Sequence, residues 1–145
     1  MFNEFIIDNN VVELLNTLIN TNELIILFIG SEGCGKTSLI KSTINEYYGD
    51  QTPDLNDILY INSLKEQGIQ YYRTELKTFC QTKSSIYNKK KFIILDDIDN
   101  INEQSQQVFR NCIDKYKKNI NILCSCNNLQ KVIESIQSRC LIVYL

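Results

Sequence analysis

The chain has 145 residues, of which 43% are hydrophobic and 22% are charged, enough for one compact domain with a buried core. Its net charge of −2 argues against a protein whose only task is to bind nucleic acid, because such proteins usually carry a basic excess. The chain contains no histidine, so any acid–base chemistry must come from carboxylates, lysine, tyrosine, cysteine or water.

Targeting signals and membrane spans are not indicated. The longest apolar run, Leu24 to Ile29, has the length of a strand. Residues 1–8 contain two acids and no basic residue, unlike a secretory signal, so we predict an intracellular protein. The six cysteines are then expected to be reduced: Cys124 and Cys126 lack zinc-ligand spacing, and the others sit singly on apolar faces.

Strands and helices alternate from the start of the chain. Asn10 and Glu13 predict a capping box, and the apolar residues that follow have helical spacing. Leu24 to Ile29 is a continuous apolar run, as expected for a strand buried on both faces. A glycine-rich loop follows, and then a helix from about Thr37 to Tyr48 that ends at Gly49.

The same alternation continues to the last residue. Further strands are predicted at residues 58–61, 92–95, 120–124 and 141–145. Between them we predict a helix that includes residues 69–80, a second helix capped by Asn100 and Glu103, and a short helix over 129–136. The segment 83–91, with Lys89-Lys90-Lys91, is expected to be a solvated basic connection. The whole pattern predicts an α/β fold in which a five-stranded parallel sheet lies between helices.

The glycine-rich loop matches the P-loop pattern G-x-x-x-x-G-K-[ST] in full, between a strand and a helix as the motif requires. Glycines let backbone N–H groups turn toward phosphate oxygens, and the following helix adds its positive N-terminus. Lys36 is expected to reach the β- and γ-phosphates of ATP, and the Thr37 hydroxyl to bind Mg²⁺. A chance glycine-rich turn is the alternative. The predicted ATP-binding residues are Gly30, Ser31, Glu32, Gly33, Cys34, Gly35, Lys36, Thr37 and Ser38.

Acidic residues follow the apolar strand Phe92 to Leu95. Because the carboxyl ends of parallel strands share the sheet edge on which the P-loop lies, Asp96 is predicted to hold the Mg²⁺. Asp97 is placed to orient or deprotonate an attacking water. The alternative is that these acids cap the next helix, a role that we predict for Asp99 or Asn100 and not for Asp96.

With both nucleotide motifs in place, nearly the whole chain resembles the AAA+ domain of a sliding-clamp loader, specifically a replication factor C small subunit. The most discriminating element is Ser138-Arg139-Cys140 just before the last strand, because many P-loop ATPases share the first two motifs. The resemblance rests on Gly30 to Ser38, Gly68-Ile69 with Arg73, Phe92 to Asp99, Gln106 to Tyr116, Cys126-Asn127 and Ile133 to Cys140.

This resemblance implies a three-layer AAA+ P-loop core over residues 1–145, with the lid and collar domains that follow it in the family absent from this sequence. Clamp loaders are ATPases that form ring-like pentamers, open a sliding clamp and grip primer–template DNA. Asn127 would be a sensor of the γ-phosphate or the attacking water, with a turn residue as the alternative. Arg139 would be an arginine finger toward ATP in a neighbouring subunit, with a local cap or acid pair as the alternative. The implied location is the nucleus in a eukaryote, otherwise the cytoplasm or a viral replication site.

Several residues depart from the family pattern. Asp97 stands where the family has glutamate, and its shorter side chain could leave an ATP-holding subunit that does not hydrolyse. Glu32 and Ser135 replace prolines, and Gln67 and Asn111 replace arginines, which weakens the case for strong DNA contact. A nucleotide kinase is a further alternative, although three arginines are too few for an arginine-rich lid.

Overall fold

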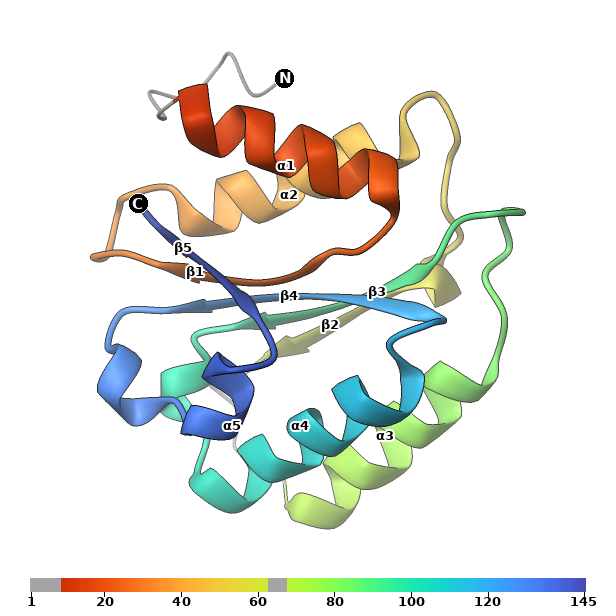
Figure 1. Ribbon diagram of the computed structural model, residues 1–145. Coiled ribbons are helices and arrows are strands. Elements are labelled where there is room, and N and C mark those ends of the chain that lie inside the picture. Colours follow the sequence, from red (N-terminus) through yellow and green to blue (C-terminus); the bar gives the residue numbers. More distant parts are fainter. Residues whose placement is uncertain (1–8, 63–67) are drawn as a thin grey trace.

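The computed structural model describes residues 9–62 and 68–145, in which a parallel sheet lies between two layers of helices (Figure 1). The five strands have the order β2-β3-β4-β1-β5, so the chain crosses over to build both edges. The predicted fold class is therefore confirmed. The strands are β1 (Ile25–Ile29), β2 (Ile58–Asn62), β3 (Lys91–Asp96), β4 (Ile120–Cys126) and β5 (Leu141–Tyr144).

Helices α1 and α2 cover one face of the sheet, and α3, α4 and α5 cover the other (Figure 1). Short 3-10 turns complete the connections at Leu55–Asp57, Ile98–Asn100 and Leu129–Lys131. None of the described helices is both long enough and apolar enough to cross a bilayer. The helices are α1 (Asn9–Thr21), α2 (Lys36–Tyr48), α3 (Ile69–Gln81), α4 (Glu103–Tyr116) and α5 (Glu134–Gln137).

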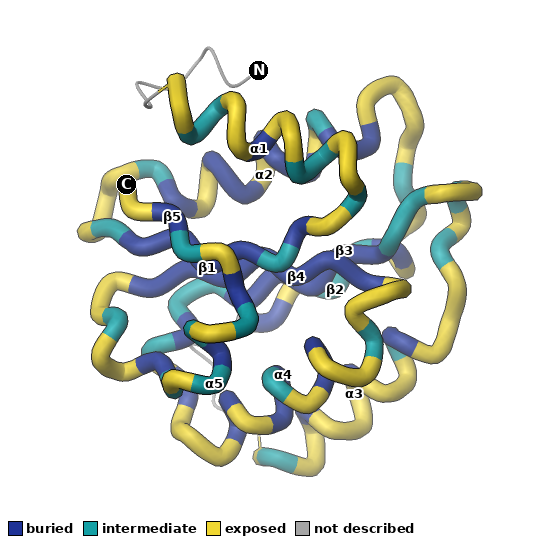
Figure 2. The backbone as a smooth tube through the Cα atoms, viewed as in Figure 1, coloured by how far each residue is buried: buried dark blue, intermediate teal, exposed yellow. Residues whose placement is uncertain are grey.

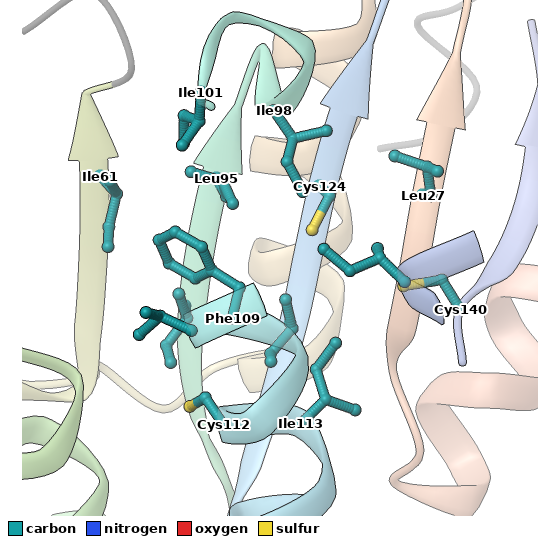
Figure 3. Packing of buried hydrophobic residues seen from close by; sticks show 14 of the residues in the cluster. Leu27, Ile61, Leu95, Ile98, Ile101, Phe109, Cys112, Ile113, Cys124 and Cys140 are labelled. Atoms are coloured by element: carbon teal, nitrogen blue, oxygen red, sulfur yellow. The ribbon is translucent and has the colours of Figure 1, made fainter. Parts of the chain in front are cut away.

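Two hydrophobic cores form because successive side chains of a strand point to opposite faces. Phe28 and Ile94 pack under α1 and α2, whereas Leu27 and Leu95 pack with Phe109 of α4 on the other face (Figure 3). Burying each such side chain contributes about 1.5–3 kcal/mol. The central strands are accordingly buried along most of their length, and the helices expose their outer faces (Figure 2).

The start of α4 differs from the prediction. Asn102 caps this helix, with its side-chain oxygen accepting from the Ser105 N–H at 2.8 Å. Asp99 and Asn100 lie in the 3-10 turn that precedes it, which takes them away from the helix end. Asn10 is likewise inside α1 and does not precede it.

The basic segment before β3 is another correction. Lys91 is the first residue of β3 and is only 2% exposed, so it does not belong to a solvated loop. The ammonium of Lys89 donates to the Tyr47 carbonyl at 2.8 Å, and that of Lys90 to the Lys117 carbonyl at 3.2 Å. These lysines therefore serve the fold through backbone carbonyls.

Five of the six cysteines are buried, and all six are free thiols. The expectation that they sit singly is wrong for Cys80, Cys112 and Cys140. The Sγ atoms of Cys80 on α3 and Cys112 on α4 are 3.4 Å apart, and the thiol of Cys140 is hydrogen-bonded with that of Cys124. Helices α3 and α4 pack against each other, so Cys80 and Cys112, which lie on their inner faces, come into contact at the interface. Cys34 is exposed, in the glycine-rich loop.

Candidate nucleotide-binding site

The glycine-rich loop connects β1 to α2, and two of its glycines have backbone angles that other residues rarely adopt. Gly33 has φ 78° and Gly35, the residue before the first turn of α2, has φ 92°. Both lie in the left-handed region, where a Cβ would clash with the backbone. A Cβ on Gly30 would lie 2.4 Å from Cys34 Sγ, so the exposed Cys34 side chain would have to move to admit it. The backbone conformation of the loop thus depends on Gly33 and Gly35.

Lys36, the first residue of α2, folds back onto this loop. Its ammonium donates to the carbonyl oxygens of Gly30 at 2.7 Å and Ser31 at 2.9 Å, and the residue is only 8% exposed. The positive end of α2 and the loop N–H groups lie beside the same ammonium. A phosphate in the loop would meet donors of both kinds.

Asp96, at the carboxyl end of β3, accepts hydrogen bonds from hydroxyl groups of three elements. Thr37 Oγ1, from α2, and the Tyr60 phenol, from β2, both donate to Oδ2, at 2.9 Å and 3.1 Å. Ser125 Oγ, from β4, donates to Oδ1. The structure therefore brings the two predicted metal ligands, Thr37 and Asp96, into direct contact.

Tyr60 and Ser125 were not identified from the sequence. Tyr60 lies in the middle of β2 and Ser125 next to the carboxyl end of β4. Ser125 is a fully buried hydroxyl in an otherwise mostly apolar strand, which is the signal that could have found it. The pKa of Tyr60 is raised by its partial burial and by the charge of Asp96. Its phenol is therefore a hydrogen-bond donor at neutral pH.

Asp97 follows Asp96 in a left-handed conformation, with φ 56° and ψ 53°, which aspartate tolerates better than most residues. Its N–H donates to Ser125 Oγ at 3.0 Å, so Ser125 joins both acids. Burial raises the pKa of the Asp97 carboxyl, and the charges of Asp96 and Asp99 raise it further, while Lys36 opposes them. A raised pKa makes a carboxylate a better proton acceptor.

Asn127 directly follows β4, beside the start of the glycine-rich loop. The N–H of Gly30 donates to the carbonyl of Cys126 at 3.3 Å, which joins the two strand ends. Asp99 accepts from the N–H groups of Asn127 and Asn128 at 3.2 Å and 3.1 Å, so this acid holds the turn after β4 and does not cap α4. The exposed side chain of Asn127 is thereby kept at the sheet edge that carries the loop.

Arg139 lies far from this group, before the amino end of β5. Its Nε donates to Asp114 at 2.7 Å and its Nη1 to the Ser135 carbonyl at 2.7 Å. Arg110 also approaches Asp114, at 3.6 Å, and the bond from Arg139 lowers the pKa of that carboxyl. The loop and Asp96 lie at the carboxyl ends of the strands, so the structure does not bring Arg139 to its own chain's loop.

Other residues that differ from the family pattern lie on the surface of the described chain or outside the described residues. Glu32 is exposed, so its charge is solvated, and Asn111 is exposed on α4. Gln67 falls outside the described residues. Together, loop N–H groups, a lysine, a hydroxyl and a carboxylate form a donor set that fits a nucleoside triphosphate and a hard divalent cation. The fold and this site define a P-loop nucleotide-binding domain.

The chain belongs to the ATPase family associated with various cellular activities (AAA), whose family model matches residues 26–145. The resemblance to replication factor C small subunits is also confirmed. The chain is 33% identical over 132 residues to replication factor C subunit 3 of Schizosaccharomyces pombe, covering 90% of this chain and 38% of that protein. It is 36% identical over 121 residues to the replication factor C small subunit of Methanosphaera stadtmanae, covering 81% of this chain and 36% of that protein.

Solved structures show the same fold at lower identity. A DNA polymerase III gamma subunit-related protein of Thermotoga maritima superposes with a TM-score of 0.74 at 22% identity, covering 92% of this chain and 45% of that one. RuvB of Thermotoga maritima gives 0.75 at 15% identity, covering 99% and 47%. The chain thus spans less than half the length of these relatives. Family membership implies nucleotide binding and ATPase chemistry.

Proposed function

We propose that this chain is the AAA+ ATPase core of a clamp-loader subunit of the replication factor C small-subunit type. The observation that carries the proposal is the contact between Thr37 and Asp96, 2.9 Å apart beside a complete P-loop. The similarity to replication factor C subunits narrows the class of ATPase. We assign residues 1–145 to this one core domain.

ATP and Mg²⁺ are the proposed ligands. Residues 30–38 would hold the phosphates through loop N–H groups, and the ammonium of Lys36, which now contacts loop carbonyls, would bind β- and γ-phosphate oxygens. Thr37 and Asp96 hold the cation, which when bound offsets charge on the transferred phosphoryl group. Ser125 and Tyr60 orient Asp96 from either side.

Hydrolysis is proposed to use three further side chains. Asp97 orients the attacking water and accepts its proton. Asn127 offers an amide to the γ-phosphate or the water. Arg139 acts on ATP bound by a neighbouring subunit, which is consistent with its place at the opposite end of the sheet from its own loop.

The proposed partners follow from the same class. They are the other subunits of a hetero-oligomeric clamp loader, a pentamer by resemblance, together with a sliding clamp and primer–template DNA. The activity couples ATP to the loading of that clamp. The protein would then act in the nucleus of a eukaryote, or in the cytoplasm or a viral replication site.

A second candidate is an ATP-holding subunit that does not hydrolyse. Asp97 favours it, because aspartate is one methylene shorter than the glutamate of the family. Such a subunit would still donate Arg139 to its neighbour. A nucleotide kinase is disfavoured because Arg139 and Arg110 are tied to Asp114, away from the loop.

Nucleotide binding by the full-length protein with its partner subunits tests the proposal. Lys36→Ala should weaken Mg²⁺-dependent ATP binding about 100-fold, because charge-assisted hydrogen bonds to phosphate are lost. Lys41→Ala, on an exposed position of the same helix, is the matched control and should bind normally. Calorimetry measures both affinities.

Clamp loading needs a second measurement. ATP turnover by the assembly should rise when a sliding clamp and primer–template DNA are added together, and Lys36→Ala in this chain should lower the stimulated rate. If ATP turnover does not respond to clamp and DNA, the protein is an AAA ATPase of another class and the clamp-loader proposal is wrong. If the Lys36 and Lys41 variants bind ATP equally well, the proposed nucleotide site is wrong.

A further inference from the structure

We propose that Tyr60 is a positioning residue of the magnesium site, which holds the carboxylate of Asp96 in place from the neighbouring strand β2. The inference rests on the proposed function, because it assigns Asp96 and Thr37 to Mg²⁺. It adds a residue from β2, the strand at the edge of the sheet. Nothing in the P-loop pattern or in the acidic strand end requires a tyrosine there.

Strand register explains how Tyr60 reaches Asp96. Asn62 of β2 pairs with Asp96 of β3, and Tyr60 pairs with Ile94. Tyr60 and Asp96 are therefore diagonal neighbours on one face of the sheet, a separation that long aromatic side chains can span. The phenol oxygen ends 3.1 Å from Asp96 Oδ2.

The hydroxyl groups of Tyr60 and Ser125 donate to different oxygens of the Asp96 carboxylate. β3 lies between β2 and β4, so Tyr60 approaches from one neighbouring strand and Ser125 from the other. Ser125 donates to Oδ1 and Tyr60 to Oδ2, which fixes the plane of the carboxylate from both sides. Such partners of a metal ligand orient it and change metal affinity.

Thr37 shares with Tyr60 the carboxylate oxygen that it contacts. Its hydroxyl donates to Oδ2, the same oxygen that Tyr60 binds. A cation that takes the Thr37 oxygen as a ligand would use a lone pair, so the O–H could still donate to Asp96. Thr37 would then contact both the metal and the carboxylate, whereas Tyr60 holds the carboxylate from β2 without being a ligand itself.

Packing alone gives a weak account of this side chain. Tyr60 is 53% exposed on an edge strand, whereas Tyr72, on α3, is 1% exposed and belongs to the core. Replacing the Tyr60 phenol by a phenyl ring should therefore leave the fold unchanged. It removes one hydroxyl group from the site and nothing else.

Tyr60→Phe in the full-length protein tests this inference. The probe is adenylyl-imidodiphosphate, an ATP analogue that is not hydrolysed, titrated by calorimetry at a series of Mg²⁺ concentrations and in EDTA. We expect the Mg²⁺ concentration for half-maximal enhancement of binding to rise about 3–10-fold, the loss of roughly one hydrogen bond. Affinity in EDTA should not change. Tyr71→Phe makes the same substitution at an exposed tyrosine of α3 and is the matched control.

Each result decides between the inference and its alternatives. Equal Mg²⁺ dependence in the Tyr60 and Tyr71 variants would overturn the role of Tyr60, while the Lys36→Ala result would still stand for the nucleotide site. A parallel loss of affinity in Mg²⁺ and in EDTA would also overturn it, because the effect would not pass through the metal. Wild-type protein whose binding ignores Mg²⁺ would overturn both proposals.

Discussion

The two ends of the sheet each hold a buried lysine with an aspartate nearby. At the carboxyl ends of the strands, Lys36 lies in the glycine-rich loop near Asp97 and Asp96. At the amino ends, Lys91 begins β3, and its charge acts on Asp57 just before β2. Both ammonium groups donate to backbone carbonyls. Burial and hydrogen bonding therefore do not separate the lysine that we propose to bind phosphate from the structural one.

The direction of the neighbouring helix does separate them. Lys36 stands at the N-terminus of α2, where the helix dipole and free N–H groups favour an added anion. Lys91 stands at the C-terminus of α3, and donates to the carbonyl of Phe79 at 2.7 Å and to Thr82. The negative helix end and the Phe79 ring, 3.9 Å away, already complement its charge. We therefore propose phosphate binding for Lys36, whereas Lys91 stabilises the fold.

Lys91→Ala tests the structural role of the lysine at the amino ends of the strands, and should lower stability. It removes a buried aliphatic stem and the donor for the Phe79 and Thr82 carbonyls, so we expect the free energy of unfolding to fall by about 3 kcal/mol. Nucleotide affinity of the folded protein should not change, in contrast to Lys36→Ala. Denaturant unfolding and calorimetry measure the two quantities, and Lys118→Ala, at an exposed position, is the control. A stable Lys91 variant that binds nucleotide poorly would reverse the assignment.

Asp57→Asn should have a smaller effect at the same end. Asp57 accepts from the N–H groups of Asp54 at 2.9 Å and Ser85 at 3.0 Å, and from the Ser85 hydroxyl. The NH₂ group of an asparagine would face one of these N–H or O–H donors, so the free energy of unfolding should fall by about 2 kcal/mol. Asp50→Asn, at an exposed position, should change stability by less than about 0.5 kcal/mol.

The pH dependence of this difference has a defined sign. Burial raises the pKa of Asp57, but its bonds from Ser85 and Asp54 and the charge of Lys91 outweigh burial, and the net pKa is lowered. A lowered native pKa stabilises the fold above the unfolded value of about 3.9, and this contribution is lost as pH falls through the native pKa. The stability gap between wild type and Asp57→Asn should therefore be full at pH 7 and shrink below about pH 4. A gap that grows on acidification would contradict this account.

Asp97→Glu sharpens the comparison at the nucleotide end, with the smallest effect. If the short side chain limits the attack of water, ATP turnover by the assembled complex should rise by about 3–10-fold, because proton acceptors must lie within hydrogen-bond reach. Stability should fall slightly, because glutamate tolerates the left-handed backbone of residue 97 less well than aspartate does. Steady-state turnover with clamp and DNA is the measurement. An unchanged rate would show that the length of the Asp97 side chain does not limit the rate of ATP hydrolysis.

Much of the nucleotide site could be predicted from the sequence, because its parts follow one another along the chain. The loop from Gly30 to Thr37 needs only its own glycines and the helix that begins at Lys36. Asp96 could be placed because a strand that ends in acids presents them at a known edge. Asp99 could not, because its partners, the N–H groups of Asn127 and Asn128, come from a turn that only the pairing of β3 with β4 brings near. The catalytic roles of Asp97, Asn127 and Arg139 stay predictions.

By itself, then, the sequence determined the alternation of strands and helices and the chemistry of the phosphate loop, since both depend on local periodicity and on residues close in the chain. The tertiary structure decided which strands are neighbours, and with it the meeting of Thr37, Tyr60 and Ser125 at one carboxylate. It also decided that Lys91 is buried, because a basic run before a strand looks the same in sequence whether it faces water or the end of a helix. Contacts between distant segments arise from packing, which no single stretch of residues contains.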